Sequence, residues 1–478
     1  QSTKEWLNNP HALTSGLILE VDDPRHGKMR QMGNVAWLAE DAEATAKRPG
    51  PTSDDLRPRL ATILSESPRE ASNIKGNSGW LEGLKVVDLT NVIAGPTIGS
   101  TLARFGADIV LVQPVEPSVD PFCAVIFGLH AHRGKKSVLL NLKTAEGREA
   151  LDKLIAEADV VTINSTDTQR DNLGLSPDRL KTLNPKLILV QLDAFGGPML
   201  GPKSGHLGYD DLVQAATGVM VRFGGGLATP EEHAHFGTID VLTGFSACVA
   251  LGAALERLRT SGRGGLARAS LAAAGNLIQA PFMYDYAGRA PFDEPSGREV
   301  RGWGPFYQCY KASDGWMFFA APTDRQEALR AVPALADLAD QPEEKLAAEL
   351  AARFAEQGVD YWAEAFAGTS STAVRLGSLH ATRDAALVLE SEGDIDLRKS
   401  TFRAIRHDLH PMGRWVDLIA PNAVRPERGH IVIPGPMPRY GAHTREVLSE
   451  LGYGDNSIKA MLAAGAAGER WSEKYLPE

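Results

Sequence analysis

The sequence predicts an α/β fold, in which a large domain with a Rossmann-like open parallel sheet is joined to a smaller α+β domain. Between residues 85 and 192, short apolar segments alternate with amphipathic helical segments. This alternation is typical of strands that run parallel and are connected by helices. Residues 300–375 instead combine aromatic residues, one strand and Ala/Glu-rich helices, and they predict the smaller domain.

The composition excludes several classes of protein. The chain has 478 residues, a net charge of −10, 43% hydrophobic residues and 23% charged residues, which are ordinary globular proportions. An acidic chain is a poor candidate for binding nucleic acid or an anionic membrane. Its three cysteines are too scattered for a disulfide framework or a metal site. No apolar run has the length of a membrane helix, and we expect a cytoplasmic protein.

The first predicted β-α-β unit starts at residue 85. Residues 85–90 (KVVDLT) are predicted as a buried strand, and a tight turn leads into a helix from Pro96 to Phe105. Proline suits the first turn of a helix, and Gly106 suits its C-terminal end. The next strand covers residues 108–112. The turn lacks the G-x-G-x-x-G pattern, so the sequence does not predict a dinucleotide-binding fingerprint.

The later elements continue the alternation. Ser176 is the predicted N-cap of one helix, because its hydroxyl can accept from the first turn. Residues 241–259 are apolar almost all round and therefore predict a buried helix. The remaining predicted elements are a helix at 145–158, a strand at 160–163, a helix at 177–183, and strands at 187–192 and 316–320.

Two segments of the chain resemble each other. Residues 50–66 and 435–450 both run from a Gly-Pro turn into a short amphipathic helix. Upstream, residues 26–30 and 412–416 also match, in the same order and at nearly equal spacing. We interpret residues 1–66 as the tail of a preceding copy of the same domain, cut from a longer chain. Coincidence between two proline-rich surface tails is the alternative.

This interpretation gives a domain organisation for the whole chain. The segment after the tail is polar and rich in Gly and Ser, which is typical of a linker. The predicted parts are a linker at 67–80, the first part of the large domain at 81–295, the small domain at 296–400, and a return to the large domain with a C-terminal tail at 401–478.

Three features could carry chemistry. Asp240 stands at the predicted start of the apolar helix, where free N–H groups and the helix dipole would stabilise its anion. It is either a structural N-cap or a carboxylate nucleophile. The basic run at 132–136 (HRGKK) either attracts phosphates or is a solvated surface run. The aromatic segments 282–286 and 303–310 are either core or a box for a cationic substrate.

Several short motifs occur together in an order that resembles one enzyme family, the class III CoA-transferases. This family includes formyl-CoA and carnitine CoA-transferases and also α-methylacyl-CoA racemase. The resemblance covers about residues 81 to 455. The motifs lie at residues 83–96 (GLKVVDLTNVIAGP), 105–109 (FGADI), 133–138 (RGKKSV), 142–148 (LKTAEGR), 158–161 (ADVV), 183–185 (LNP), 208–210 (GYD) and 260–264 (TSGRG).

The resemblance implies an activity and a set of site residues. Members move CoA from an acyl-CoA donor, such as acetyl-CoA, to a small carboxylic acid through an aspartyl-CoA intermediate. The family's acylated aspartate falls on Asp240, and CoA serves as co-substrate without a metal. The family's CoA contacts fall on Val92, Ala94, Lys136, Leu140, Asn164 and Leu173.

At some positions the chain departs from the family pattern. Lys136 stands where arginine is usual, which keeps the charge but not a bidentate phosphate grip. Pro114 stands where several members have a CoA-binding arginine. Racemases of the family use a histidine where this chain has Tyr209, so the resemblance favours CoA transfer. An acyl-CoA racemase or isomerase and a non-catalytic partner copy are the alternatives.

The resemblance also implies a partner. Family members form two interlocked subunits, so we expect a homodimer or, given the internal repeat, a fused pseudo-dimer with a second copy. Fused two-copy members include enzymes that act on dimethylsulfoniopropionate and cleave it to dimethyl sulfide; carnitine-type transfer is the alternative. A sulfonium cation would suit exposed aromatic rings. The candidate substrate residues are Tyr209, Trp303, Phe306 and Tyr307.

Overall fold

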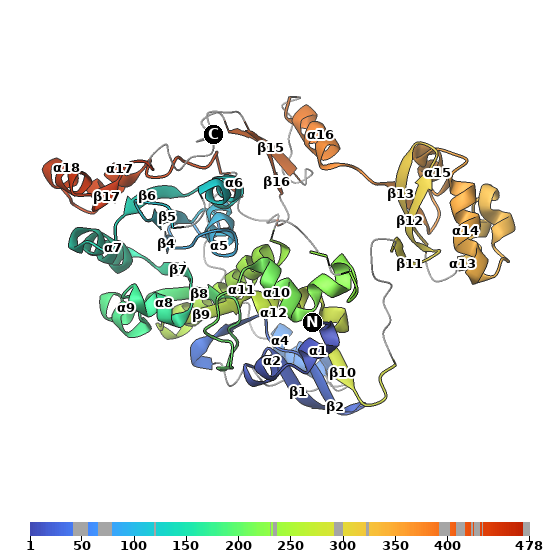
Figure 1. The fold of residues 1–478 in the computed structure, drawn as a ribbon, viewed down its shortest axis with the longest axis horizontal. Coiled ribbons are helices and arrows are strands. Elements are labelled where there is room, and N and C mark those ends of the chain that lie inside the picture. The colour runs from blue at the N-terminus through green and yellow to red at the C-terminus, as the bar shows by residue number, and fades with distance from the viewer. Residues whose placement is uncertain are drawn as a thin grey trace. The chain divides into compact units, whose positions relative to one another are not determined.

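An eight-stranded sheet forms the centre of the larger of two units in the computed structural model (Figure 1). The larger unit comprises Gln1–Met220, Glu232–Arg289 and Asp394–Glu478, and the smaller comprises Val221–Glu231 and Ala290–Gly393. The structure describes residues 1–41, 56–65, 79–118, 121–229, 231–232, 237–290, 300–321, 325–391, 402–407, 416–421, 424, 431–432 and 434–471.

The strand order of the large sheet is that of a doubly wound fold. From one edge to the other the strands are β17 (Ala467–Gly468), β6 (Lys136–Leu140), β5 (Asp108–Gln113), β4 (Lys85–Asp88), β7 (Val160–Asn164), β8 (Ile188–Asp193), β9 (Gly265–Ser270) and β3 (Ala36–Leu38). The six inner strands are parallel, and the two edge strands are antiparallel. The order reverses between β4 and β7, where such folds bind ligands. The Rossmann-like fold is confirmed.

Apolar layers cover both faces of this sheet. Neighbouring residues of β4 point to opposite faces, so Val86 packs in one core cluster and Val87 in the other. The helices of the unit, apart from its N-terminal segment, are α5 (Ala94–Arg104), α6 (Pro121–Ala131), α7 (Ala145–Glu157), α8 (Asp167–Asn172), α9 (Pro177–Leu183), α10 (Asp210–Thr217), α11 (Thr238–Ser261), α12 (Leu271–Ile278), η3 (Ala280–Phe282), α17 (Thr444–Glu450) and α18 (Asp455–Ala463).

The predicted elements up to residue 193 and the strand at 316–320 agree with the observed ones to within two residues. The apolar helix predicted at residues 241–259 differs from the observed α11 in two respects. It begins earlier, after an N-cap at Gly237, so Asp240 is its third residue and not its N-cap. It is also not buried on all sides, since Phe245 and Val249 are 49% and 66% exposed.

This helix, Thr238–Ser261, has the length and apolarity of a membrane span, so the expectation that no apolar run reaches that length is wrong; half of its most apolar stretch is buried inside the protein. A buried core helix meets the same criterion of length and apolarity, so α11 is weak evidence for a membrane.

The smaller unit has its own core. Its four-stranded antiparallel sheet packs on helices through a cluster of rings that includes Phe319, Phe354 and Trp362. The strands are β11 (Gly302–Gly304), β12 (Tyr307–Ala312), β13 (Gly315–Ala320) and β14 (Thr372–Arg375). The helices are η2 (Met220–Gly224), α13 (Arg325–Arg330), η4 (Pro333–Leu338), α14 (Glu343–Phe354), α15 (Val359–Ala365) and α16 (Leu379–Ser391).

The N-terminal segment, residues 1–41, belongs to the larger unit. Trp6 is fully buried, and its ring N–H donates to Asn276 at 2.7 Å. Thr3 donates to Gln279 at 2.7 Å. The segment contains α1 (Thr3–Leu7), α2 (Pro10–Thr14), β1 (Ile18–Asp23), β2 (Gly27–Met32), β3 and η1 (Ala39–Asp41). The sequence did not indicate where this segment packs.

Four further elements complete the described chain. A short helix, α4 (Leu56–Ser65), follows the N-terminal segment, β10 (Tyr284–Tyr286) pairs with β2, and β15 (Phe402–His407) pairs with β16 (Val416–Pro421). Most of the predicted linker at 67–80 lies outside the described residues.

Candidate functional site

The turn after β4 is fixed to the end of β7 at the point where the strand order reverses. The backbone N–H of Asn91 donates to the Asn164 side-chain oxygen at 3.0 Å. The Asn164 amide in turn donates to the Asn91 carbonyl at 2.8 Å. This pair of hydrogen bonds fixes the backbone at the switch point, the place where open α/β sheets bind their ligands.

The same turn contains a strained residue. Val92 has a φ of 64°, the only positive value outside glycine in the described part of the chain. A β-branched residue in this conformation costs about 1–3 kcal/mol, and such strain is concentrated at functional sites. The turn leads into α5, whose N-cap is Ile93, a residue that cannot accept a hydrogen bond with its side chain. The first N–H groups of α5 are therefore suited to a ligand oxygen.

A buried ion pair between Lys135 and Asp88 connects this turn and α5 to the sheet. The Lys135 ammonium donates to Asp88 at 2.7 Å and to the Pro96 carbonyl at 2.8 Å, and both side chains are fully buried. Asp88 also accepts from the Thr90 backbone and the Thr162 hydroxyl, both at 3.0 Å. Burial alone would raise the pKa of Asp88, but the charge and hydrogen bond of Lys135 together with the hydrogen bonds from Thr90 outweigh it, so the pKa lies below its ordinary value. The network joins β4, β7 and α5.

The basic run at residues 132–136 is mostly buried, so it is not a solvated surface run. His132, Arg133 and Lys135 are buried. Arg133 donates to the backbone carbonyls of Pro434 and Gly435 and so holds the C-terminal part of the chain. The Lys136 ammonium lies between the carboxylates of two residues of α17, Glu446 and Glu450, at 3.2 Å from each. A contact between Lys136 and CoA stays a prediction.

Asp240 lies in the first turn of α11 and is only 8% exposed. Its backbone N–H donates to the carboxylate of Asp210 at 2.8 Å. Asp210 is buried at the first residue of α10 and also accepts from Gln214. Because the N-cap Gly237 has no side chain, Asp210 supplies the acceptor that the start of α11 needs.

The Asp240 carboxylate lies beside the strained turn. A Cβ atom added to Gly237 would lie 3.0 Å from the Ile93 side chain and 3.2 Å from an Asp240 carboxylate oxygen. Gly244 allows α11 to approach α5, since a Cβ there would lie 2.7 Å from the Ala94 carbonyl. The fold thus brings together two segments that are far apart in the sequence.

The surroundings of Asp240 favour its neutral form. Burial, then the charges of Asp210 and Asp211, raises the pKa of Asp240 to about 7. Asp240 is the third residue of α11 and not its N-cap, and its pKa is raised, so the prediction that free N–H groups stabilise its anion is wrong. At neutral pH the carboxyl group is therefore poised to release and accept a proton, and it is nucleophilic in its ionised fraction.

The other predicted CoA contacts are spread along the sheet. Ala94 is the first residue of α5, two residues after Val92. Leu140 is the last residue of β6, two strands from β4, and Lys136 is the first residue of the same strand. Leu173 ends α8 and is exposed. The contacts of all these residues with CoA stay predictions.

The predicted substrate residues belong to different units. Tyr209 is exposed and directly precedes Asp210 in the larger unit. Trp303 and Tyr307 are exposed in the smaller unit, whereas Phe306 is buried in the core of that unit. Among the described residues, no group of three or more His, Cys, Asp or Glu side chains could hold a metal ion.

Sequence reasoning missed the role of Asp210. The motif at 208–210 contains it, but its partner Asp240 lies 30 residues away on another helix. The acidic residue at the end of the motif at 208–210 was the available signal. Only the packing of α10 on α11 shows that the two carboxyl groups are neighbours.

Comparisons with known proteins find relatives of this chain by sequence and by fold. The model of CoA-transferase family III matches residues 81–444. The CoA-transferase/lyase DddD of Marinomonas sp. (strain MWYL1) is 36% identical over 486 residues, covering 100% of this chain and 58% of that protein. The mouse α-methylacyl-CoA racemase is 30% identical over 61% of this chain and 76% of its own length. This chain thus spans less than two thirds of the Marinomonas relative.

Solved structures show the same fold. The crystal structure of Rv3272 from Mycobacterium tuberculosis aligns with a TM-score of 0.63 and 22% identity, over 78% of this chain and 99% of its own. A CAIB/BAIF family protein from Brucella suis aligns with a TM-score of 0.60 and 24% identity, over 78% of this chain and 100% of its own.

Proposed function

The chain belongs to CoA-transferase family III, and we propose that it moves CoA from an acyl-CoA donor, such as acetyl-CoA, to a small carboxylic acid with Asp240 as nucleophile. The observation that carries this proposal is the position of Asp240, in the first turn of α11 beside the strained turn at the switch point of the sheet. The acceptor that we propose is dimethylsulfoniopropionate. The 36% identity with a CoA-transferase/lyase over the whole chain supports it.

The first half of the proposed reaction loads Asp240. Its carboxylate attacks the thioester carbonyl of the donor, the C–S bond breaks, and CoA leaves as the thiolate. This gives a mixed anhydride between the donor acyl group and Asp240. The thiolate then attacks the Asp240 carbonyl, which forms an aspartyl-CoA thioester and releases the donor as its free carboxylate.

The second half reverses these steps with a new acid. The acceptor carboxylate attacks the aspartyl-CoA carbonyl and expels the CoA thiolate, giving a second mixed anhydride. The thiolate attacks the acceptor's carbonyl, forms the new acyl-CoA and frees the Asp240 carboxylate. The thioester energy is kept on the protein throughout, so closure against water is needed at each anhydride. The N–H groups at the start of α5 are suited to stabilise oxyanions in these steps.

Cleavage can follow transfer when the acceptor carries a sulfonium group on its β-carbon. Thioester formation makes the α-proton more acidic, and the freed Asp240 carboxylate accepts it. The electron pair forms a C=C bond, and dimethyl sulfide leaves from the β-carbon with the C–S electrons. A base with a pKa of about 7 is well matched to this step near neutral pH.

The experiment is a transfer assay with a panel of acceptors. The chain is incubated with acetyl-CoA and with dimethylsulfoniopropionate, carnitine or other carboxylates, while new acyl-CoA and volatile sulfide are measured. We expect a new acyl-CoA and sulfide with dimethylsulfoniopropionate, and neither product with the Asp240→Asn variant. Wild-type turnover by Asp240→Asn would exclude Asp240 as nucleophile. Deuterium uptake from D₂O into a 2-methylacyl-CoA without CoA exchange would show a racemase instead.

A further inference from the structure

A glutamine side chain is buried near the end of strand β8. All residues of this strand are buried, and Leu189, on the same face as Gln191, belongs to an apolar core cluster. Gln191 itself is 0% exposed. Burying an amide costs free energy unless its polar groups find hydrogen-bond partners. The partners of Gln191 therefore indicate what a polar side chain does at this position.

The Gln191 side chain binds both sides of the turn between β7 and α8. Its amide nitrogen donates to the backbone carbonyl of Ser165 at 2.8 Å and to the carboxylate of Asp167 at 2.9 Å. Its amide oxygen accepts from the guanidinium of Arg170 at 2.7 Å. Arg170 also forms an ion pair with Asp167 at 3.0 Å. These contacts fix the chain from the end of β7 into the first turns of α8.

The segment that Gln191 fixes carries two of the predicted CoA contacts. Asn164, the last residue of β7, directly precedes Ser165 and holds the strained turn at Val92 through two hydrogen bonds. Leu173 follows α8 as its C-cap. A strained conformation persists only where the surrounding structure determines it. Because Gln191 holds the Ser165 carbonyl, it also limits how far Asn164 can move.

We infer that Gln191 is a positioning residue for the CoA end of the site. It does not touch the ligand, because it is fully buried and both hydrogens of its amide are used within the protein. It acts through Ser165 on Asn164, and so on the turn that the Asn164 side chain holds. The inference rests on the proposed function for the identity of the ligand.

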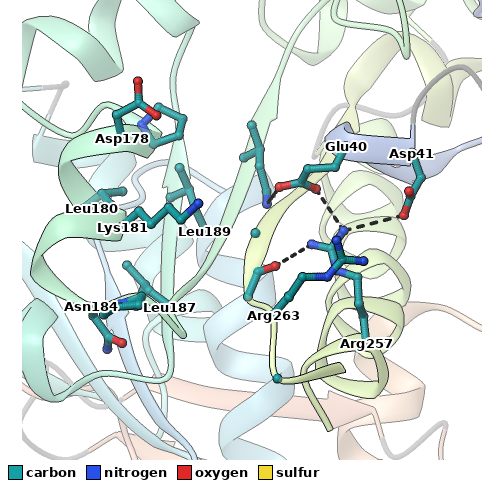
Figure 2. A pocket seen from close by; sticks show the side chains of 16 residues that line it. Glu40, Asp41, Asp178, Leu180, Lys181, Asn184, Leu187, Leu189, Arg257 and Arg263 are labelled. Atoms are coloured by element: carbon teal, nitrogen blue, oxygen red, sulfur yellow. Dashed lines mark hydrogen bonds and ion pairs between the residues drawn. The ribbon is translucent and has the colours of Figure 1, made fainter. Parts of the chain in front are cut away.

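The opposite ends of β7 and β8 provide a contrast. A cavity of about 440 Å³ lies there, lined in part by α9, by Leu187 and by residues 262–265 (Figure 2). Asn184, at the end of α9, lines this cavity, and its amide donates to the Ala158 carbonyl at 2.7 Å. Open α/β sheets bind their ligands at the carboxyl ends of the strands. Asn184 thus fixes the start of β7, away from Asn164.

The first test measures the affinity for CoA by calorimetry, without an acceptor acid. Gln191→Met nearly keeps the side-chain volume but removes the three hydrogen bonds, so the dissociation constant for CoA should rise about tenfold. The KM for acetyl-CoA should rise with it. The kcat should stay near the wild-type value, because Asp240 is held by Asp210 on another helix. An unchanged CoA affinity in folded Gln191→Met would overturn the inference.

Two control variants separate positioning from stability. Gln279 on the other side of the unit's core is also fully buried, and its side chain also makes three hydrogen bonds. Gln279→Met should destabilise the chain to a similar degree, and Asn184→Leu should loosen the other end of β7. Both variants should bind CoA as the unmodified chain does. A loss of CoA affinity in either control that equals the loss in Gln191→Met would refute the positioning role.

A double variant tests the route through Asn164. If Gln191 acts through Asn164, adding Gln191→Met to Asn164→Ala should cause little further loss of CoA affinity. A second loss of about tenfold would contradict this route.

A milder pair of variants covers the case in which Gln191→Met does not fold. Gln191→Asn keeps an amide on a shorter side chain, and its CoA affinity is compared with that of Gln279→Asn in the same way. No CoA binding by the unmodified chain would overturn the proposed function together with this inference. CoA binding and transfer by the unmodified chain, with equal CoA affinity in the Gln191 variants, would overturn this inference alone.

Discussion

At the scale of the residue, Asp240 is a carboxyl group whose environment opposes its charge. It is buried next to a second acid, Asp210, and its pKa is raised to about 7. A nucleophilic carboxylate must be ionised, so the same surroundings that make Asp240 suited to proton transfer limit its nucleophilic fraction at neutral pH. Two predictions follow from this opposition, one for rate and one for stability.

The first prediction concerns the pH dependence of the rate. Because Asp240 must lose its proton to attack, kcat/KM for CoA transfer should fall roughly tenfold per pH unit below about 7. Asp210→Asn keeps an acceptor for the Asp240 N–H but removes the charge, so it should move the profile to lower pH. An unchanged profile in Asp210→Asn would contradict this electrostatic coupling.

The second prediction concerns stability. The pKa of Asp240 is higher in the folded chain, about 7, than its ordinary value of 3.8, so folding favours the protonated form. This contribution is complete below pH 4 and is lost as the pH rises through 7. The neutral Asp240→Asn should therefore gain roughly 2–4 kcal/mol over wild type at pH 8 and little at pH 4. Denaturant unfolding at both pH values measures this difference.

A control variant tests whether replacing an exposed aspartate with asparagine has the same effect on stability. Asp455 is exposed at the start of α18, and Asp455→Asn should change the free energy of unfolding by no more than about 0.5 kcal/mol at either pH. An equal gain in both variants, or a gain for Asp240→Asn that does not depend on pH, would refute the assigned environment of Asp240.

Residue by residue, the sequence predicted part of the site. Asp240 and Asn164 were assigned through the family resemblance, and they lie at the switch point of the sheet or beside the turn that leads into α5. The ionisation of Asp240 was predicted wrongly, because it depends first on burial and then on the charge of Asp210 on another helix, and no local pattern contains either. The strain at Val92 was also invisible, since valine is not a residue type that indicates a positive φ.

At the scale of the element, two adjacent lysines provide a third prediction. Lys135 is fully buried against Asp88, whereas Lys136 is partly exposed between two glutamates. Lys135→Met would leave a buried charge on Asp88 without its partner and should cost about 3–5 kcal/mol. Lys136→Met should cost no more than about 1 kcal/mol. Equal losses in a denaturant titration would contradict the network under α5.

A fourth prediction compares two glycines of α11. A Cβ at Gly244 would lie 2.6 Å from the Cβ of Thr97 on α5, whereas a Cβ at Gly252 would meet nothing within 4 Å. Gly244→Ala should push α11 from α5, destabilise the chain by about 1–3 kcal/mol and lower kcat/KM by moving Asp240. Gly252→Ala should instead stabilise it by about 1 kcal/mol and leave kcat/KM unchanged. Equal effects of Gly244→Ala and Gly252→Ala on stability and on kcat/KM would refute the close packing of α11 on α5.

Element positions were predictable where a local signal exists. Ser176 caps α9 as predicted, because its hydroxyl accepts from the Arg179 backbone. The exposed side of α11 was not predictable, since an all-apolar helix carries no periodicity to show which face is open. Val249 and Phe245 on that side became evident only once the neighbours of α11 were known.

At the scale of the whole molecule, the chain consists of a large unit, a smaller unit and an N-terminal segment that is built into the large one. That residues 1–66 are the tail of a preceding copy stays a prediction from the sequence repeat, and the repeat does not predict where they pack. Contacts such as Trp6 with Asn276 span 270 positions and depend on the finished fold. The domain boundaries of the sequence stay predictions, since the linker at 67–80 is mostly outside the described residues.

The central claim is that Asp240 carries the acyl group and then CoA. The most direct measurement is to incubate the chain with acetyl-CoA, quench with hydroxylamine, digest the protein and locate the modified residue by mass spectrometry. The account predicts a hydroxamate on Asp240 that requires acetyl-CoA and is absent from Asp240→Asn. CoA transfer with Asp240 unmodified, or with the label on another residue, would contradict it.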